Sequence, residues 1–420
     1  MVLSADAGYL DGAALGRSTS SSLRMPAVST GALLTAVLFL ALNLQMLTFS
    51  GDLVVSESGG GPALKVYHAV FACVGLLVLV RGRLVRWRPE MVVYFVVIGA
   101  TTLIASLHFG AQFVLANTVF AVYAAVIGAT VGRMTGAGPV VRVLRWTSVV
   151  VLLLVLVKGV IFLPEIIRFL AAPNGHPLLP TFYGGGPNIE ATWVGMSGVF
   201  LIGSRMFLPY MAASAAISVA YASRVGLIVV MLVMAGSIVG GWMRSGRSGR
   251  SARGRSFLLA VCVLMIGAAG VTVAQDIDGA DYIAQRFQNI GEDPGSTSRF
   301  TLWTGGARVF AAYPLGVGIG NAVPLIERMT AVSITEDNVH NQYLQHLVDT
   351  GIQGLLVFLL FVGLTWRRLL RSQLQDPMLL YVGIYFVLAL IQFRGAEALL
   401  WFVYGLQTGT ETLAGEAHAA

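Results

Sequence analysis

The chain has 420 residues, of which 56% are hydrophobic and only 11% are charged. A soluble globular domain usually carries about 25% charged residues, so this composition excludes an ordinary soluble protein and indicates one that crosses a membrane many times. The net charge of +7 does not by itself indicate a nucleic-acid partner, because arginines between membrane spans follow from the positive-inside rule. Cys73 and Cys262 both lie in apolar runs and predict neither a disulfide nor a metal site.

The apolar runs form two blocks of predicted membrane spans, each span needing about 20 apolar residues. Residues 30–274 predict transmembrane helices 1–9, with runs near 31–49, 63–80, 90–108, 111–132, 146–170, 191–208, 209–223, 225–243 and 257–274. Residues 340–406 predict helices 10–12, with runs near 341–364, 378–393 and 395–406. The expected fold class is therefore all-α, a polytopic membrane protein with about 12 transmembrane helices. The runs 209–223 and 395–406 are short for a span.

The positive charges predict the orientation of the spans. If the N-terminus lies in the cytoplasm and the spans alternate, most of the 27 Lys and Arg residues fall on the inner side, as the positive-inside rule requires. Residues 1–29 are then a disordered cytoplasmic N-terminus, and residues 407–420 are a cytoplasmic tail. The basic stretch 244–255 is explained best as an orientation signal and second as a contact with anionic lipid. Lys158 lies within a span, where we expect it to pair with Glu165 or with a carboxylate of another span.

Two polar segments fall on the outer side of the membrane. The first covers residues 171–190, and the second covers 275–339, which is too polar to lie in lipid. Long loops carry function more often than short ones. Their glycines and prolines indicate turns and short helices instead of one disordered tether. We therefore look for a site on these loops and at the helix ends beside them.

Arg224 opens the predicted span 225–243 on the outer face, where the positive-inside rule disfavours it. One explanation is an arginine that reaches the lipid headgroups. The other is an anion site, because a guanidinium keeps its charge and binds phosphate through a planar fork. Ser223 is placed to cap this helix, and the helix N-terminus adds positive potential.

Arg299 precedes a segment whose apolar residues fit a helix lying on a surface, from Phe300 to Phe310. It is either a second anion ligand or a solvated arginine paired with an acid of the same loop. The glycine-rich stretch 313–320 follows. A lone Gly-x-Gly-x-Gly is weak evidence for phosphate binding, so we interpret it as a close-packed turn.

His340 stands where the chain re-enters the membrane. A single histidine at a helix start is most often structural, but the following polar residues recur at helical spacing: Gln342, Gln345, Asp349 and Gln353. A polar stripe on a membrane helix normally faces a bundle interior or an aqueous cavity. His340 is therefore a candidate general base. Its spacing from His346 is not that of a helical metal pair.

These residues resemble the bacterial O-antigen ligase and O-antigen polymerase superfamily. The resemblance is carried by Ser-Arg at 223–224, SRFTLW at 298–303, YPLGVGIGNA at 313–322 and HNQYLQHLVDTGIQGLL at 340–356. GGGPN at 184–188 adds to it. The resemblance covers about 180–360, while the earlier spans match the superfamily only in hydropathy.

The resemblance implies a C-type membrane glycosyltransferase in the cytoplasmic (inner) membrane, with its active site on the extracytoplasmic side. Its donor would be a polyprenyl-pyrophosphate-linked glycan and its acceptor a hydroxyl of a lipid or another glycan, with no cofactor and no metal. By position, Arg224 and Arg299 would bind the donor pyrophosphate and His340 would be the catalytic residue. Tyr183, Asn188, Asp337 and Asn341 would be possible sugar or acceptor contacts.

Several functions fit these residues. The first is a ligase that moves assembled glycan to a separate acceptor, as in lipopolysaccharide synthesis. The alternative is a polymerase that joins repeat units on the carrier, and a protein O-oligosaccharyltransferase is less expected. A transporter is also less expected, because transporters tend to have repeated halves and ionisable residues near the midplane, whereas here the polar residues gather at one surface.

Overall fold

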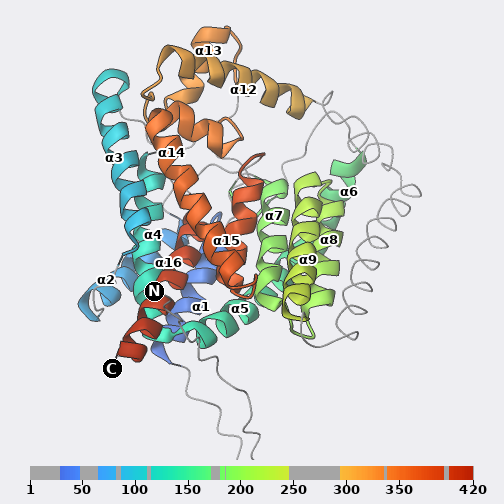
Figure 1. Cartoon of the computed structure of the whole chain (residues 1–420). Helices are drawn as coiled ribbons and strands as arrows, with labels where there is room; N and C mark the ends of the chain where they lie inside the picture. The colour runs from blue at the N-terminus through green and yellow to red at the C-terminus, as the bar shows by residue number, and fades with distance from the viewer. Residues whose placement is uncertain are drawn as a thin grey trace, which may run out of the picture.

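The computed structural model describes most of the chain as a bundle of helices (Figure 1). It describes residues 29–47, 65–81, 87–110, 115–171, 180–184, 186–245, 294–334, 338–391 and 397–419. Within these ranges there are α-helices and one 3-10 helix but no strand, which confirms the all-helical prediction. The predicted span 257–274 and the first part of the outer loop, 275–293, lie outside the described residues.

Five of the described helices are long and apolar enough to cross a bilayer: Pro89–Phe109, Thr118–Thr135, Ala137–Ile161, Arg224–Met243 and Gln342–Arg371. Four shorter apolar helices accompany them: Thr30–Asn43, Val66–Val78, Phe207–Ala220 and Pro377–Leu388. The length and apolar composition of these helices are typical of a membrane protein. The count of about 12 spans stays a prediction.

The described residues between 29 and 171 form six helices: α1 Thr30–Asn43, α2 Val66–Arg81, α3 Pro89–Phe109, α4 Leu115–Thr135, α5 Ala137–Ile161 and α6 Leu163–Ala171. The predicted run 146–170 is therefore not one helix, because α5 ends at Ile161 and a short α6 follows. Pro164 lies in the first turn of α6 and has no N–H to continue the hydrogen-bond ladder of α5.

The next elements stand side by side on one flank of the bundle (Figure 1). They are α7 Pro187–Ser197, the 3-10 helix Gly198–Leu201, α8 Phe207–Ala220 and α9 Arg224–Ser245. The predicted span 191–208 is divided between α7, the 3-10 helix, the turn that follows and the first two residues of α8. Aromatic rings fix α7 against a later helix: Trp193 stacks with Tyr381, with ring centroids 6.0 Å apart.

The last part begins with two helices of the predicted outer loop, α12 Pro294–Ala312 and α13 Ala322–Thr330. They lie across one end of the bundle (Figure 1). The remaining helices are α14 Gln342–Arg371, α15 Pro377–Leu388 and α16 Ala398–Ala419. Short helices were predicted for this loop; its described residues contain one short helix, α13, and the longer α12 of 19 residues.

Helices α4 and α16 pack with almost no space between their backbones. A Cβ added to Gly128 would lie 2.4 Å from the carbonyl oxygen of Phe402, and one added to Gly409 would lie 1.9 Å from that of Ala129. Small residues spaced four apart let membrane helices approach this closely. Helix α16, which makes this contact, continues to Ala419, well past the predicted end of the last span at 406.

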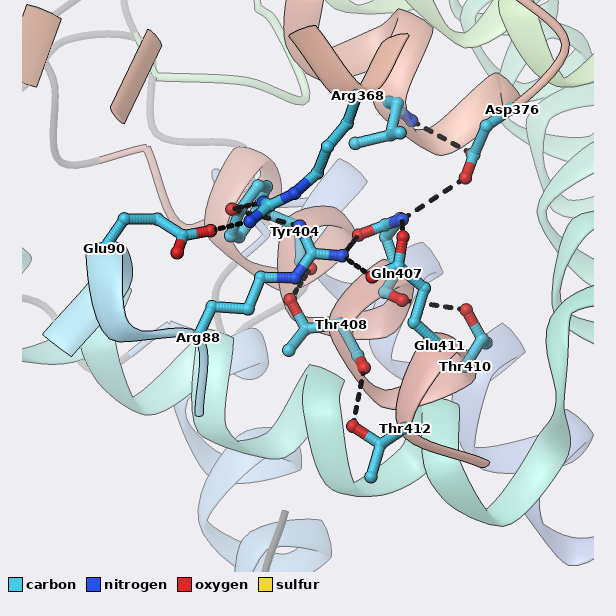
Figure 2. A network of polar contacts seen from close by, with 11 residues as sticks. Arg88, Glu90, Arg368, Asp376, Tyr404, Gln407, Thr408, Thr410, Glu411 and Thr412 are labelled. Carbon is cyan, nitrogen blue, oxygen red and sulfur yellow. Dashed lines mark hydrogen bonds and ion pairs between the residues drawn. The ribbon is translucent and has the colours of Figure 1, made fainter. Parts of the chain in front are cut away.

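A polar network ties α3, α14, α15 and α16 together where α14 ends and α15 begins (Figure 2). Arg88 is ion-paired with Glu411 and Arg368 with Glu90. Both guanidinium groups also donate to the hydroxyl of Tyr404, at 3.3 and 3.2 Å. These groups hold together the end of the bundle that lies opposite the start of α14.

Candidate functional site

Arg224 is the first residue of α9, and the three residues before it form a buried turn. The hydroxyl of Ser223 accepts a hydrogen bond of 3.1 Å from the backbone N–H of Gly226, which confirms the predicted cap. The N–H of Ser223 donates to the carbonyl of Ser218 at 2.7 Å. Ala222 has a φ of 47°, in the left-handed region that residues with a Cβ seldom adopt. The start of α9 is therefore held in one position, with Arg224 half-buried.

Close packing fixes the first turn of α9 as well. A Cβ added to Gly226 would lie 2.5 Å from the hydroxyl oxygen of Ser218 and 2.9 Å from the Cβ of Ala191. Both neighbours belong to other helices, α8 and α7. Only glycine leaves room for this approach.

A buried ion pair lies beside this turn. Lys158 of α5 pairs with Glu190 of α7, and both side chains are almost completely buried. Of the two partners expected for Lys158, the structure has the carboxylate from another helix and not Glu165. The hydroxyl of Tyr221, in the α8–α9 turn, donates to Glu190 Oε1 at 2.9 Å.

The same carboxylate holds the loop before α7. The backbone N–H of Phe182 donates to Glu190 Oε2 at 2.6 Å, and the Lys158 ammonium donates to the carbonyl of Pro180 at 2.9 Å. Burial, followed by the nearby Glu190 carboxylate, raises the pKa of Tyr221. The Tyr221 hydroxyl therefore stays protonated and remains a donor.

Tyr183 and Asn188 lie at either side of the Gly-rich stretch before α7. Tyr183 is fully buried, and its hydroxyl donates to the side-chain oxygen of Asn43. It thus joins this loop to the end of α1. Asn188 is in the first turn of α7, where its carbonyl accepts from the hydroxyl of Thr192 at 2.7 Å. Their sugar-binding roles stay predictions, and Tyr183 also has a clear packing role.

His340 lies just before α14, whose first residue is Gln342. It adopts a φ of 52°, and its N–H donates to the side chain of Asn338 at 2.8 Å. Asn341 is the N-cap, and its side-chain oxygen accepts from the N–H of Leu344 at 3.0 Å. Residues held in the left-handed region gather at functional sites. The side chain of Asn341, predicted as an acceptor contact, is engaged in capping.

Arg299 belongs to α12, and one turn further along Trp303 contacts the His340 segment. The indole N–H of Trp303 donates to the carbonyl of Val339 at 2.9 Å. Residues four apart share one helix face, so Arg299 lies on the side of α12 that meets residues 338–340. This arrangement brings α12 and the start of α14 together.

The glycine-rich stretch is a close-packed turn, as predicted, and it seats on a kink in α14. Gly351 interrupts α14 with a φ of 71°. A Cβ on Gly316 would lie 2.6 Å from the carbonyl oxygen of Asp349, and one on Gly351 would lie 2.5 Å from the backbone carbon of Leu315. The N–H of Gly318 donates to the carbonyl of Asp349 at 2.8 Å. The turn therefore donates hydrogen bonds to carbonyl groups that the kink in α14 leaves without a partner inside the helix.

The polar stripe of α14 is buried for its first two turns, including Gln342, Gln345 and Asp349. Gln345 accepts from the N–H of Val339 at 2.8 Å and donates to Asp349 Oδ2 at 2.9 Å. His346 lies 3.1 Å from the hydroxyl of Tyr94. The prediction that this face looks into the bundle is confirmed. The contact of His346 with Tyr94 was not predicted, because Tyr94 lies far away in the sequence.

Aromatic and polar contacts place the starts of α7, α9 and α14 at one end of the bundle (Figure 1). Tyr221, which precedes α9, bonds to Glu190 in the first turn of α7. The ring of Tyr385 stacks with Trp193 of α7, and its hydroxyl donates to Gln342 at 2.9 Å. The elements that carry Arg224, Arg299 and His340 thus share one end of the molecule.

The structure adds little on the remaining candidate residues. Asp337 lies outside the described residues. Among the residues the structure describes, no group of three or more His, Cys, Asp or Glu side chains could hold a metal ion. The roles of Arg224 and Arg299 in binding pyrophosphate, and of His340 in catalysis, stay predictions.

Comparison with known families gives one result. Residues 209–359 match the family model of the O-antigen ligases. This region contains Arg224, Arg299 and His340, whereas Tyr183 and Asn188 precede it. No curated protein matches the chain.

Proposed function

We propose that the chain is a membrane glycosyltransferase of the O-antigen ligase type, with a polyprenyl-pyrophosphate-linked glycan as its donor, because residues 209–359 match the family model of the O-antigen ligases. It transfers the glycan to an acceptor hydroxyl at the outer surface of the cytoplasmic membrane. The observation that supports this most is that the matched region contains Arg224, Arg299 and His340, whose elements share one end of the helix bundle.

The reaction needs one bond to form and one to break. The acceptor oxygen attacks the anomeric carbon of the first sugar and forms the new glycosidic bond. The bond from that carbon to the phosphate oxygen breaks, and its electron pair leaves with the lipid pyrophosphate. The hydroxyl proton passes to a base, which is His340 in this proposal.

The two arginines suit the leaving group. Negative charge grows on the pyrophosphate as the anomeric bond breaks, and fixed guanidinium groups stabilise such charge without reorganising. Arg224 is fixed by the Ser223 cap and by the tight contact of Gly226 with α7 and α8. The N–H groups at the start of α9 add positive potential at the same place.

His340 suits the acceptor. Its backbone is held in the left-handed region, beside the cap of α14 and the indole of Trp303 on Val339. In this proposal a ring nitrogen of His340 accepts the proton of the acceptor hydroxyl. We propose that the glycan is transferred to a separate acceptor molecule, as in a ligase.

A transfer assay tests the proposal. Purified protein in nanodiscs receives a labelled polyprenyl-pyrophosphate glycan, alone and with candidate lipid or glycan acceptors. We expect label to move only when an acceptor is present. Growth of longer glycan on the carrier alone would replace the ligase with a polymerase, and label moving to a protein would indicate an oligosaccharyltransferase. Transport of the intact donor without any bond change would overturn the proposal.

A further inference from the structure

We propose that the buried pair Lys158–Glu190 is a positioning device for the donor site, which sets the place of Arg224 through Tyr221. This inference rests on the proposed function of Arg224. It assigns to α5 and α7, outside the matched region, a part in binding the donor. Neither Lys158 nor Glu190 has to touch the substrate.

Glu190 joins three separate parts of the chain. Its two carboxylate oxygens accept from the Lys158 ammonium of α5, the Tyr221 hydroxyl of the α8–α9 turn and the Phe182 N–H of the preceding loop. Glu190 has no exposed surface. Both carboxylate oxygens are therefore hydrogen-bonded, and the three donors come from three different segments of the chain.

Lys158 completes this arrangement from the opposite side. Its ammonium also donates to the carbonyl of Pro180 at 2.9 Å. It lies over the rings of Phe182 and Tyr221, 5.1 and 5.5 Å from their centroids. One cation thus contacts both the loop 180–184 and the turn that precedes Arg224.

A buried ion pair is a poor means of adding stability. Removing two charges from water is costly, and well-packed apolar residues in their place are often as stable. Hydrogen bonds to a charge have a defined direction, however, which apolar contacts lack. The pair is therefore better suited to fixing geometry than to strengthening the fold.

The connection from Glu190 to Arg224 is short. Tyr221 lies three residues before Arg224, and the intervening Ala222 and Ser223 are fully buried. Ala191, next to Glu190, meets the first turn of α9 at Gly226. A displacement of Glu190 is therefore passed to Arg224 through two contacts. Misplacing a binding group by about 1 Å costs on the order of a hundredfold in rate.

The test uses variants that keep the size of the side chain. Tyr221→Phe removes only the donor to Glu190, and Glu190→Gln removes the charge. Both are compared with Glu90→Gln, which removes the carboxylate that pairs with Arg368 at the opposite end (Figure 2). Binding of polyprenyl pyrophosphate and the kinetics of transfer are measured for the full chain in nanodiscs.

We expect Tyr221→Phe to raise the Kd for polyprenyl pyrophosphate and the donor KM by about tenfold, with kcat changed less. Glu90→Gln should leave both unchanged. Because Glu190→Gln leaves Lys158 buried without its charged partner, the double variant Lys158→Met with Glu190→Gln keeps the test valid. It should insert and melt near the wild-type temperature while donor binding stays weak.

Two results separate the possible failures. If Arg224→Ala abolishes donor binding but Tyr221→Phe and the double variant bind as wild type, the positioning role is wrong and the proposed function stands. If Arg224→Ala binds donor normally, the proposed function of Arg224 is wrong and the inference falls with it. If Glu90→Gln loses as much donor binding as Tyr221→Phe, the loss comes from general destabilisation of the bundle. That result would also overturn the inference.

Discussion

The indole N–H of Trp303 donates a 2.9 Å hydrogen bond to the carbonyl oxygen of Val339, the residue before His340. This contact joins α12, which carries Arg299, to the start of α14. The distance between a proposed anion ligand and a proposed base therefore depends on a bond that neither of them makes.

Removal of this bond should weaken transfer more than folding. Trp303→Phe keeps an aromatic ring but has no N–H, so we expect a loss of about 1 kcal/mol in stability and a fall in kcat on the order of tenfold. Transfer kinetics and the melting temperature in detergent check this. Trp146→Phe is the control, because Trp146 is 62% exposed on α5. Equal kinetics in both variants would show that this contact does not organise the site.

Arg224 should require its guanidinium and not only its charge. Arg224→Ala should abolish transfer, and Arg224→Lys should also lose much of it, because an ammonium cannot bind phosphate through a planar fork. Neither change should prevent insertion, since Arg224 is half-buried at a helix start. Arg142→Ala, at an exposed position in the first turns of α5, is the control. Wild-type transfer by Arg224→Ala would remove this residue from the mechanism.

Two substitutions separate the contribution of the backbone conformation of His340 from that of its side chain. Its φ of 52° suits glycine, so His340→Gly should fold as well as the wild type or gain up to about 1 kcal/mol. Transfer should nevertheless be lost, because the base is absent. His340→Ala should lose transfer as well. Measured transfer by His340→Gly at the wild-type rate would show that only the backbone shape of this residue matters.

The kink in α14 should not tolerate a side chain. In Gly351→Ala, the new Cβ would lie 2.5 Å from the backbone of Leu315 at a φ of 71°, so we expect a loss of about 1–3 kcal/mol. Gly363→Ala is the matched control in the same helix, since no atom lies within 4 Å of its added Cβ. That change should stabilise by about 0.5–1 kcal/mol. Thermal melting of both variants in detergent distinguishes a steric requirement from a general preference for helix formers.

The interface of α4 and α16 gives a comparable test away from the site. Gly409→Ala would direct a methyl group into the carbonyl of Ala129, which should destabilise by about 1–3 kcal/mol through overpacking. Gly415→Ala lies in the same helix with nothing within 4 Å and should be neutral or stabilising. A melting temperature for Gly409→Ala equal to that of Gly415→Ala would contradict this packing.

Composition and local sequence patterns predict the class of the protein and much of its local structure. Low charge and long apolar runs predict membrane helices because lipid leaves backbone groups no partner outside the segment. The Ser223 cap and the helix predicted over Phe300–Phe310 depend on neighbours within a few residues, so their signals are local. The structure confirms both, although α12 begins earlier, at Pro294, and includes Arg299. The tight turn at 313–320 is also confirmed, but the groups it packs against belong to the distant kink of α14.

Which helices meet, and which groups pair with the buried charges, depends on the packing of segments far apart in the chain. Lys158 is in reach of Glu165 by helix periodicity, yet it pairs with Glu190, because the packing of α5 against α7 brings that carboxylate closer. The contact of Trp303 with Val339, and of His346 with Tyr94, likewise joins residues far apart in the chain. Hydrophobic periodicity indicates that one face of a helix is buried, but it does not indicate which other helix covers that face. In a bundle of similar apolar helices, that choice is made by side-chain packing and hydrogen bonds across the interfaces.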